Sequence, residues 1–407
     1  MLNGPPIRTR MRSYRPRLLL SLIWLATLAA PGFGEDATTT RLRHAGQSLS
    51  AGHLDRAEDE LQSVLRTAPE EDRALDLLGV ARILQHREAD AEILFQRSIQ
   101  NKPDFASAHA HLGLLYLQTG RENDGVPELQ EAVRLDPART DASDALVHLF
   151  RKHARAAASS GSWKQALGLL IQARKLAPKN PDVQFEFGTA AFQMSLMQDA
   201  VNGFKETLSL RKDDPSALYG LGRAYGNLGR LDDARQQFVL YIALHPDDPS
   251  GYCSLGITLA ALERSDEARA QFERSIAIAP EQAEAYFRLG TLDLRNGKWE
   301  SAKANLRHVL DRNPEHVGAL SALGRVEFEQ QHYAEAAALL RRATDIDDSL
   351  LEAHYYLGLA YGRVGQRVES EQQFQRSTEL QHEDLQKRRA LWNRLDLPPA
   401  TPQPQRP

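Results

Sequence analysis

Apolar residues recur at helical spacing along nearly the whole chain, in pairs of short stretches separated by glycine-containing or polar turns. In one pair, the first stretch contains Tyr252, Leu255 and Leu259. The second stretch contains Ala268 and Phe272, which lie four positions apart. Because residues three or four apart share one face of an α-helix, each pair of stretches predicts two amphipathic helices.

Glycines repeat at a fixed interval within this pattern. Gly113 follows Gly79 by thirty-four positions, and the same step separates each glycine of the series from the next between Gly188 and Gly358. The full set is Gly79, Gly113, Gly188, Gly222, Gly256, Gly290, Gly324 and Gly358. A fixed period of this length indicates one supersecondary repeat that is copied and stacked, so function is expected on a repeated surface rather than in a single pocket.

Other residue types keep register with the glycines. An alanine stands twelve positions after most of them, and a Phe or Leu follows four positions later. The alanines are Ala91, Ala200, Ala234, Ala268, Ala302 and Ala336. We expect the small residues to let the two helices of a repeat cross closely, while the larger side chains fill the space around the crossing. Prolines close many repeats, because proline cannot continue a helix without losing a hydrogen bond.

The register predicts ten helix pairs and locates one insertion. The repeats start near Thr38, Asp72, Ala106, Thr140, Pro181, Pro215, Pro249, Ala283, Val317 and Leu351. The step from Pro137 to Pro178 is seven positions longer than the period, so the fourth repeat (140–180) contains the insertion. An insertion of that length makes about two helical turns, which predicts one lengthened helix. Its overhang carries the basic residues His148, Arg151, Lys152, His153 and Arg155.

This combination of residues resembles the tetratricopeptide repeat. Leu-Gly, a tyrosine three positions later in several repeats (Tyr116, Tyr225 and Tyr361), then alanine, Phe or Leu, and proline recur over residues 38–382. The resemblance implies an all-α fold, an α-solenoid in which antiparallel helix pairs form a right-handed superhelix. It also implies that the first helices line a concave groove. Ala45 and Ser370 depart from the pattern in the terminal repeats, which are often atypical.

The two ends of the chain differ from the repeats. Residues 1–34 contain five arginines, no acidic residue and a short apolar run from Leu18 to Ala30, which predicts a cleaved signal peptide or, alternatively, an uncleaved N-terminal membrane anchor. A cleaved signal is favoured because a spanning helix needs about 20 residues. Residues 383–396 predict a capping helix that covers the last repeat, and the five prolines of residues 397–407 predict a disordered tail.

Charge and cysteine content narrow the class of partner. Removal of residues 1–34 changes the formal charge from −4 to −9. An acidic chain argues against nucleic acid as a partner, because phosphate binding needs a basic surface. Cys253 is the only cysteine, so an internal disulfide is not possible. Contact with a membrane is expected only through the N-terminal segment, if that segment is retained.

The sequence favours a protein that is not an enzyme and holds no metal or cofactor. It contains no phosphate-binding glycine loop, no zinc-protease His-Glu pair and no nucleophile elbow. His109 and His111 are two positions apart, whereas metal ligands on one helix face are three or four apart, so we expect both to be solvated. Cys253 is either a reactive thiol or a small, half-buried packing residue, and the second role is favoured.

The groove implied by the family resemblance carries aromatic residues and arginines. Its predicted residues are Phe185, Phe192, Gln193, Tyr219, Arg223, Asn227, Ile257, Phe287, Thr291, Arg295, Arg325, Phe328, Tyr355 and Arg363. Aromatic and arginine side chains dominate interface hot spots, and arginine binds carboxylates with two parallel hydrogen bonds. We therefore expect an extended peptide or a helix with acidic groups to bind there. The alternative is a solvated face in which the arginines pair with Glu284, Glu329 and Glu352.

The basic overhang of His148, Arg151, Lys152 and Arg155 is a second candidate docking patch or, alternatively, a solvated helix end. Together these features predict an exported, non-enzymatic scaffold that binds segments of partner proteins, in a bacterial periplasm or outside the cell. One alternative is an accessory factor in the assembly of the cell envelope, pili or secretion complexes. A less favoured alternative is a regulatory subunit of an enzyme.

Overall fold

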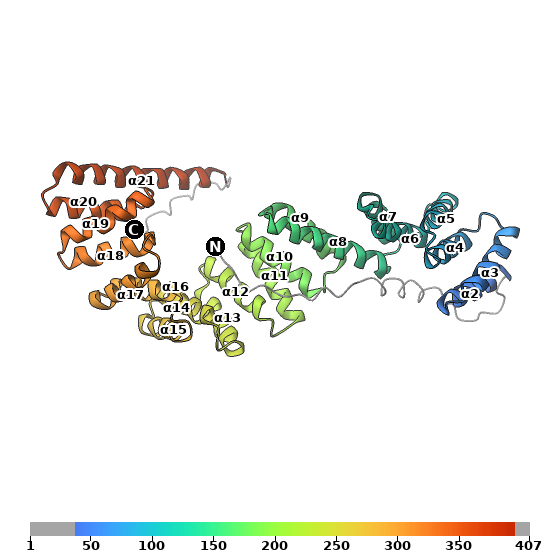
Figure 1. The fold of residues 1–407 in the computed structure, drawn as a ribbon, viewed down its shortest axis with the longest axis horizontal. Helices are drawn as coiled ribbons and strands as arrows, with labels where there is room; N and C mark the ends of the chain where they lie inside the picture. The colour runs from blue at the N-terminus through green and yellow to red at the C-terminus, as the bar shows by residue number, and fades with distance from the viewer. Residues whose placement is uncertain (1–36, 395–407) are drawn as a thin grey trace, which may run out of the picture. The chain divides into compact units, whose positions relative to one another are not determined.

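The computed structural model describes residues 37–394, which contain twenty helices and no strand (Figure 1). The predicted signal segment and the predicted proline-rich tail lie outside these residues. Contacts within the chain define two compact blocks, which divide between Leu210 and Arg211. No helix between residues 37 and 394 has both the length and the apolar character that crossing a membrane requires.

The N-terminal block consists of five helix pairs. Their bounds are α2 (Ala37–Ser50), α3 (Leu54–Thr67), α4 (Asp72–Leu84), α5 (Glu88–Asn101), α6 (Ala106–Gln118), α7 (Glu122–Leu135), α8 (Thr140–Ser159), α9 (Trp163–Leu176), α10 (Pro181–Gln193) and α11 (Met197–Leu210). Helix α8 has 20 residues, whereas α4, α6 and α10 have 13. The insertion therefore lengthens the first helix of the fourth repeat, as the spacing of the prolines predicts.

The C-terminal block also consists of five helix pairs. Their bounds are α12 (Pro215–Asn227), α13 (Leu231–Leu244), α14 (Pro249–Ala261), α15 (Ser265–Ile278), α16 (Ala283–Arg295), α17 (Trp299–Arg312), α18 (Val317–Glu329), α19 (Tyr333–Ile346), α20 (Leu351–Arg363) and α21 (Arg367–Arg394). Helices α12 and α14 each start with a proline that follows a capping aspartate, Asp214 or Asp248. The aspartate accepts a hydrogen bond from a backbone N–H group of the first turn, and the proline has no N–H that needs a partner.

The periodic glycines lie where the two helices of a repeat cross. A Cβ atom on Gly256 would lie 2.6 Å from the ring of Phe272, and one on Gly324 would lie 2.6 Å from Cγ of Leu340. All eight glycines contact the Phe or Leu that stands sixteen positions later, on the second helix of the same repeat. The alanines of the second helices, such as Ala268, are fully buried. These contacts confirm the close helix crossing that the sequence predicts.

Left-handed backbone recurs in the turn between the two helices of each repeat. Ten of the described residues have positive φ, and they follow the same period as the glycines except across the insertion. They are Gly52, His86, Gly120, Gly161, Ser195, Gly229, Glu263, Gly297, Gln331 and Gly365. A left-handed residue lets the chain reverse after a helix, so the turn geometry is kept even where the sequence lacks glycine.

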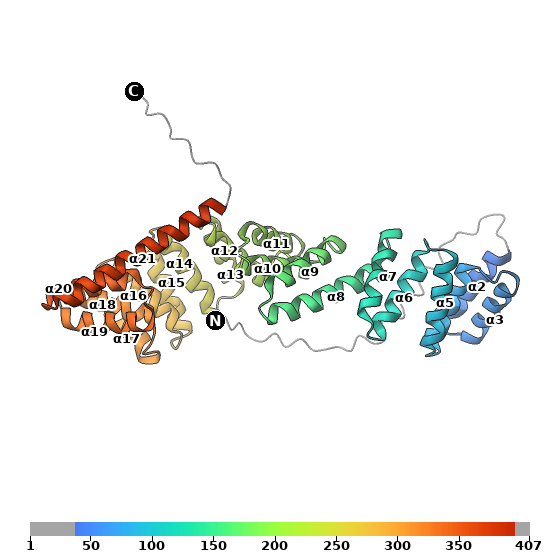
Figure 2. The same cartoon turned by 90° about the horizontal axis from the view of Figure 1, so that it is seen from above.

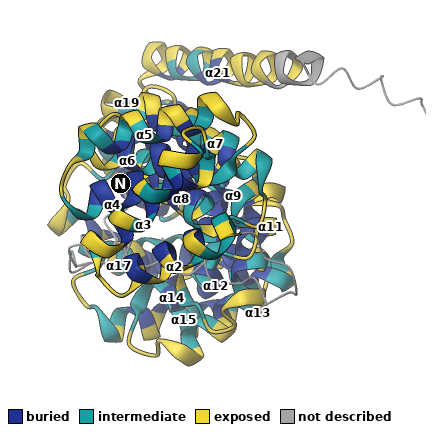
Figure 3. Ribbon diagram, turned by 90° about the vertical axis from the view of Figure 1, so that its right-hand side faces the viewer, coloured by how far each residue is buried: buried dark blue, intermediate teal, exposed yellow. Residues whose placement is uncertain are grey.

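The C-terminal end of the array departs from the prediction. Helix α21 is one continuous helix of 28 residues, so the prediction of a separate capping helix starting at residue 383 is wrong (Figure 2). No glycine or proline interrupts the segment, and without such a residue nothing ends the helix. Leu385 is 47% exposed, and the other described side chains beyond Leu380 are exposed as well (Figure 3). The described part of this extension therefore does not bury an apolar face on the last repeat.

Candidate partner-binding surfaces

The first helices of successive repeats contact one another within each block. Helices α2, α4, α6 and α8 form one such series, and α12, α14, α16, α18 and α20 form another. Among the described residues, successive second helices make no comparable contacts. The first helices thus lie closer together than the second helices, which places them on the inner side of each stack. We call the exposed surface of the first helices the first-helix face.

Three predicted residues lie on the first-helix face of the N-terminal block, all on α10. The half-buried ring of Phe185 lies 5.8 Å from the ring of Phe204. Phe192 is also half-buried, whereas Gln193 is exposed. The two phenylalanines therefore contribute part of their surface to packing and leave the remainder accessible to a partner.

The aromatic residues of the C-terminal block connect neighbouring repeats. The Tyr219 hydroxyl lies 3.1 Å from that of Ser254 on the next first helix. The ring of Phe287 lies 4.9 Å from His316, which precedes α18. Both aromatics are half-buried. Both aromatics therefore pack between one repeat and the next. Sequence spacing alone does not reveal these contacts.

The other apolar residues of this face differ in how much of their surface is exposed. Phe328 packs between the rings of Tyr333 and Tyr356, with ring centres 5.4 and 5.6 Å away. Tyr355 is 46% exposed and Ile257 is 38% exposed. Of the apolar residues predicted for this face of the C-terminal block, Tyr355 and Ile257 therefore offer the most surface to a partner.

The arginines of the first-helix face have different partners. Arg325 forms an ion pair with Glu352, with Nη1 2.6 Å from Oε1. Arg295 donates a hydrogen bond to the Ala260 carbonyl, and Arg363 lies over the Tyr333 ring. Between residues 37 and 394, no ion pair involves Arg295 or Arg363. The alternative of fully paired arginines therefore holds for Arg325 but not for Arg295 or Arg363.

The remaining polar residues of this face make local contacts. Asn227 donates to the Arg223 carbonyl at 2.9 Å, and the Thr291 hydroxyl donates to the Arg288 carbonyl at 2.9 Å. Glu284 pairs with Arg288 of its own helix rather than with an arginine of the predicted set. These contacts position the side chains but leave the two exposed arginines, Arg295 and Arg363, without a described acidic partner.

Ion pairs cross-link the basic overhang of α8 to its neighbours. Arg151 and Arg155 both donate to Glu186 of α10, at 2.9 and 2.5 Å. Lys152 donates to Glu122 of α7 at 2.8 Å, and this hydrogen bond holds the pKa of Glu122 below its usual value. His148, the other predicted member, is exposed. The overhang is thus a set of inter-repeat ion pairs, and a partner would have to compete with Glu186 and Glu122 for these cations.

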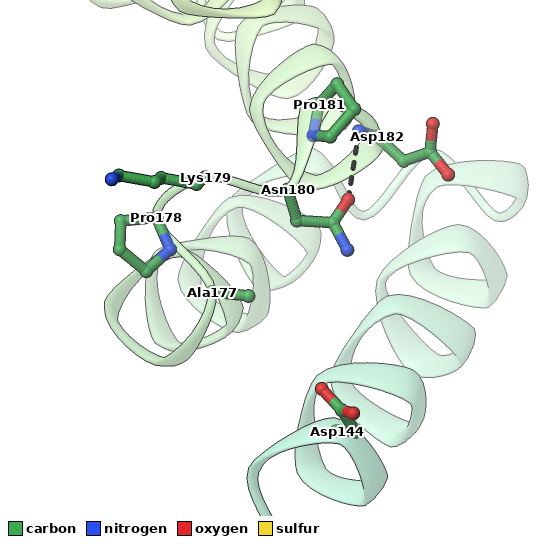
Figure 4. Close-up of a pocket in the computed structure, with 7 residues that line it drawn as sticks. All are labelled: Asp144, Ala177, Pro178, Lys179, Asn180, Pro181 and Asp182. Carbon is green, nitrogen blue, oxygen red and sulfur yellow. Dashed lines mark hydrogen bonds between the residues drawn. The ribbon is translucent and has the colours of Figure 1, made fainter. Parts of the chain in front are cut away.

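A pocket of about 600 Å³ opens between α8 and the start of α10 (Figure 4). Its lining is Asp144, Ala177, Pro178, Lys179, Asn180, Pro181 and Asp182. Burial, together with the nearby charge of Asp141, raises the pKa of Asp144. The Lys179 side chain extends away from Asp144, and Asp182 forms an ion pair with Arg151, with Nη2 3.2 Å from Oδ2 (Figure 4). Asp144 is therefore the lining carboxylate without an ion pair among the described residues. Sequence spacing does not reveal this pocket, because the two segments that form it, α8 and residues 177–182, meet only after folding.

Two histidines depart from the prediction that they are solvated. His109 and His111 are 8% and 5% exposed. Nδ1 of His109 lies 2.6 Å from Glu128, and Nδ1 of His111 lies 2.7 Å from Asp76. Burial is possible because each ring has a carboxylate partner on a neighbouring helix. No group of three possible metal ligands occurs among the residues that the structure describes.

Cys253 is 4% exposed and packs inside the C-terminal block. Burial, with a further contribution from the charge of Glu284, raises the pKa of its thiol to about 12. A thiol with such a pKa contains little thiolate at neutral pH, and the thiolate is the reactive form. The packing role is therefore the better description of this residue.

Sequence comparisons match most of the repeated region. A family profile described as tetratricopeptide repeat matches residues 48–104, 185–249, 253–292 and 287–350. A second profile with the same description matches residues 106–139. No curated protein sequence matches this chain.

Solved structures align with parts of this chain at low sequence identity. A tetratricopeptide repeat protein from Parabacteroides merdae aligns with a TM-score of 0.50 and 13% identity, over 58% of this chain and 93% of that protein. MamA from Desulfovibrio magneticus RS-1 aligns with a TM-score of 0.40 and 20% identity, over 42% and 97%. YrrB, described as a TPR protein with an unusual peptide-binding site, aligns with a TM-score of 0.38 and 20% identity, over 45% and 95%. At 13% identity, the likeness to the Parabacteroides merdae protein concerns the fold alone.

Proposed function

This chain belongs to the tetratricopeptide repeat family, and from that premise we propose that it is a non-enzymatic scaffold. Its first-helix face binds segments of partner proteins. The fold supports a role in protein–protein interaction because a stack of repeats presents a long surface rather than a closed pocket. The buried, weakly acidic thiol of Cys253 adds no support for an enzymatic role.

The two exposed arginines carry the more specific part of the proposal. Arg295 and Arg363 are exposed on the first-helix face of the C-terminal block, and their described contacts are a carbonyl and an aromatic ring. A guanidinium in that setting can still form two parallel hydrogen bonds with a carboxylate. Tyr355 and Ile257 add apolar surface to the same face. We infer that the partner segment combines acidic and apolar residues.

The cellular setting of the proposal rests on the N-terminal sequence. The basic and apolar residues of segment 1–34 support export to a periplasm or to the outside of the cell, or attachment to a membrane if the segment is retained. The same segment supports the alternative of an accessory factor in envelope, pilus or secretion-complex assembly. Identification of the captured partners separates this alternative from a general scaffold.

The test is a capture experiment with the tagged chain in an extract of the cell envelope. The variant Arg295→Glu plus Arg363→Glu reverses both exposed charges, and we expect it to lose the acidic partners that the wild type retains. Each lost arginine–carboxylate contact weakens binding, and the introduced glutamates repel the ligand. Quantitative mass spectrometry of the captured proteins is the measurement.

The matched control is Lys205→Glu plus Arg341→Glu, which makes the same change in charge on exposed positions of two second helices. This control should retain the partners. Equal capture by the wild type and by the Arg295→Glu plus Arg363→Glu variant would show that the first-helix face is not the binding surface.

A further inference from the structure

Helix α13 exposes apolar residues on the side opposite to its buried residues. Ala234 and Phe238 are buried inside the repeat. On the other side, Val239 and Leu240 are each 46% exposed and Leu244 is 43% exposed. Ala243 is exposed between them. We call these four residues, Val239, Leu240, Ala243 and Leu244, the α13 stripe.

Equivalent positions on the other second helices of this block are mostly charged or polar. The positions of Val239 and Leu240 are occupied by Glu273 and Arg274 in α15, Arg307 and His308 in α17, and Arg341 and Arg342 in α19. The position of Ala243 holds Asp311 in α17 and Asp345 in α19. The position of Leu244 is apolar in α15 and α19 as well, where it holds Ile278 and Ile346. Val239 and Leu240 are therefore the local departure, and together with Ala243 and Leu244 they form a continuous stripe at helical spacing.

A helix that is apolar on both sides is typical of a buried helix, and contiguous exposed apolar surface marks an interaction site. We propose that two copies of this chain associate through α13, with the two α13 helices packed antiparallel about a twofold axis. In this arrangement Val239 of each copy lies against Leu244 of the other. Likewise, Leu240 of each copy lies against the small Ala243 of the other.

Charge complementarity favours a second copy as the occupant. The centre of the stripe lies between Tyr241 and Ile242. Arg235 lies before this centre and Asp247 lies after it, at nearly equal distances along the chain. Antiparallel packing about that centre therefore brings Arg235 of one copy to Asp247 of the other, twice per dimer. It also aligns the two helix dipoles in opposite directions, which is favourable.

Both charged groups are available for this contact. The Arg235 side chain is 38% exposed, and its described ion pair is a long one of 3.6 Å with Asp232. Asp247 is exposed, and no ion pair among residues 37–394 involves it. Because the contact uses one helix face, we expect a weak dimer of the class that buries less than about 1,200 Å² in total.

Sedimentation equilibrium of the purified chain, from about 1 to about 200 µM, tests the proposal without any peptide ligand. We expect the wild type to form a reversible dimer. The variant Val239→Arg plus Leu240→Arg gives α13 the same pair of residues that α19 carries at these positions, so the repeat has a precedent for folding with them. We expect its association constant to fall at least about tenfold.

Charge reversal tests the antiparallel register. Arg235→Asp and Asp247→Arg should each weaken the dimer, whereas the two changes in one chain should restore it, because each new pair again has opposite charges. Restoration would not occur if Arg235 only stabilised its own helix.

Three results would overturn the proposal. The wild type could stay monomeric up to about 200 µM, which would leave the stripe to a different protein. The Val239→Arg plus Leu240→Arg variant could associate as strongly as the wild type, which would place the dimer contact elsewhere. The double charge reversal could fail to restore association, which would exclude the antiparallel register. Since these measurements involve no partner segment, their outcome is independent of the function proposed for the first-helix face.

Discussion

The periodic glycines on the first helices are required because each one closely faces a Phe or Leu side chain of the second helix. Gly256 and Gly222 face phenylalanine rings, whereas Gly290 faces a leucine. A glycine inside a helix costs about 1 kcal/mol relative to alanine, so its recurrence needs a compensating contact. The close approach of the ring or the leucine to the backbone is that contact.

We predict that Gly256→Leu destabilises the protein by about 1 to 3 kcal/mol, because the new side chain overpacks the contact with Phe272. The measurement is chemical denaturation followed by circular dichroism. Gly226→Ala is the matched control, since nothing lies within 4 Å of a Cβ atom at Gly226. It should be neutral or stabilise α12 slightly. An unchanged free energy of unfolding for Gly256→Leu would contradict the packing explanation.

The residue types of the candidate site were predictable, but their accessibility was not. The repeat register places Tyr219, Phe287 and Phe328 on the first helices, where the structure also has them. Whether an aromatic ring there packs against the next repeat or faces a partner depends on the distance between helices. That distance is a property of the stack. For the same reason, the pairing of Arg325 with Glu352 and the lack of a described acidic partner for Arg363 emerged only from the structure.

At the scale of elements, the turn within each repeat keeps one backbone geometry with different residues. Gly297 has the left-handed conformation at φ 72°, and Gln331 adopts it one repeat later at φ 66°. Residues with a Cβ atom are strained by roughly 1 to 2 kcal/mol in this conformation, whereas glycine is not. Four repeats therefore fold despite a local preference against the turn: those with His86, Ser195, Glu263 and Gln331.

Replacement of Gln331 by glycine should stabilise the protein by up to about 1 kcal/mol, because removal of the strain outweighs the greater freedom of glycine in the unfolded chain. The reverse change, Gly297→Ala, should destabilise it by about 1 kcal/mol. Equilibrium denaturation of both variants gives the two values. A lower free energy of unfolding for Gln331→Gly would mean that contacts of the Gln331 side chain stabilise the protein by more than its backbone strain destabilises it.

At the scale of the whole molecule, stability is built from contacts between neighbouring repeats. Ion pairs such as Arg82–Glu58 and Lys303–Glu327 link a first helix to the second helix of the preceding repeat. In an array of this kind, each repeat depends on its immediate neighbours, and the terminal repeats have one neighbour fewer. Helix α21 covers α20 with its first half, while the described side chains of its second half are exposed.

We predict that ending the chain after His382 changes the free energy of unfolding by less than about 0.5 kcal/mol, because no buried side chain is described beyond that point. Ending it after Gln366 should destabilise the C-terminal block strongly, since Leu357 and Ala360 lose the helix that covers them. Thermal unfolding of both truncated chains is the measurement. A large loss from the first truncation would show that the extension stabilises the array after all.

The sequence by itself determined the repeat length, the number of helix pairs, the position of the insertion and the packing role of the glycines. These properties depend on residues within one helix or one helix pair, so the periodic sequence pattern is enough to predict them. Only the tertiary structure decided which polar groups meet, as when His111 on α6 reaches Asp76 on α4, and that α21 continues without a break. It also revealed the α13 stripe as exposed. Contacts between repeats depend on how far apart the stacked helices lie, and no spacing along the chain encodes that distance.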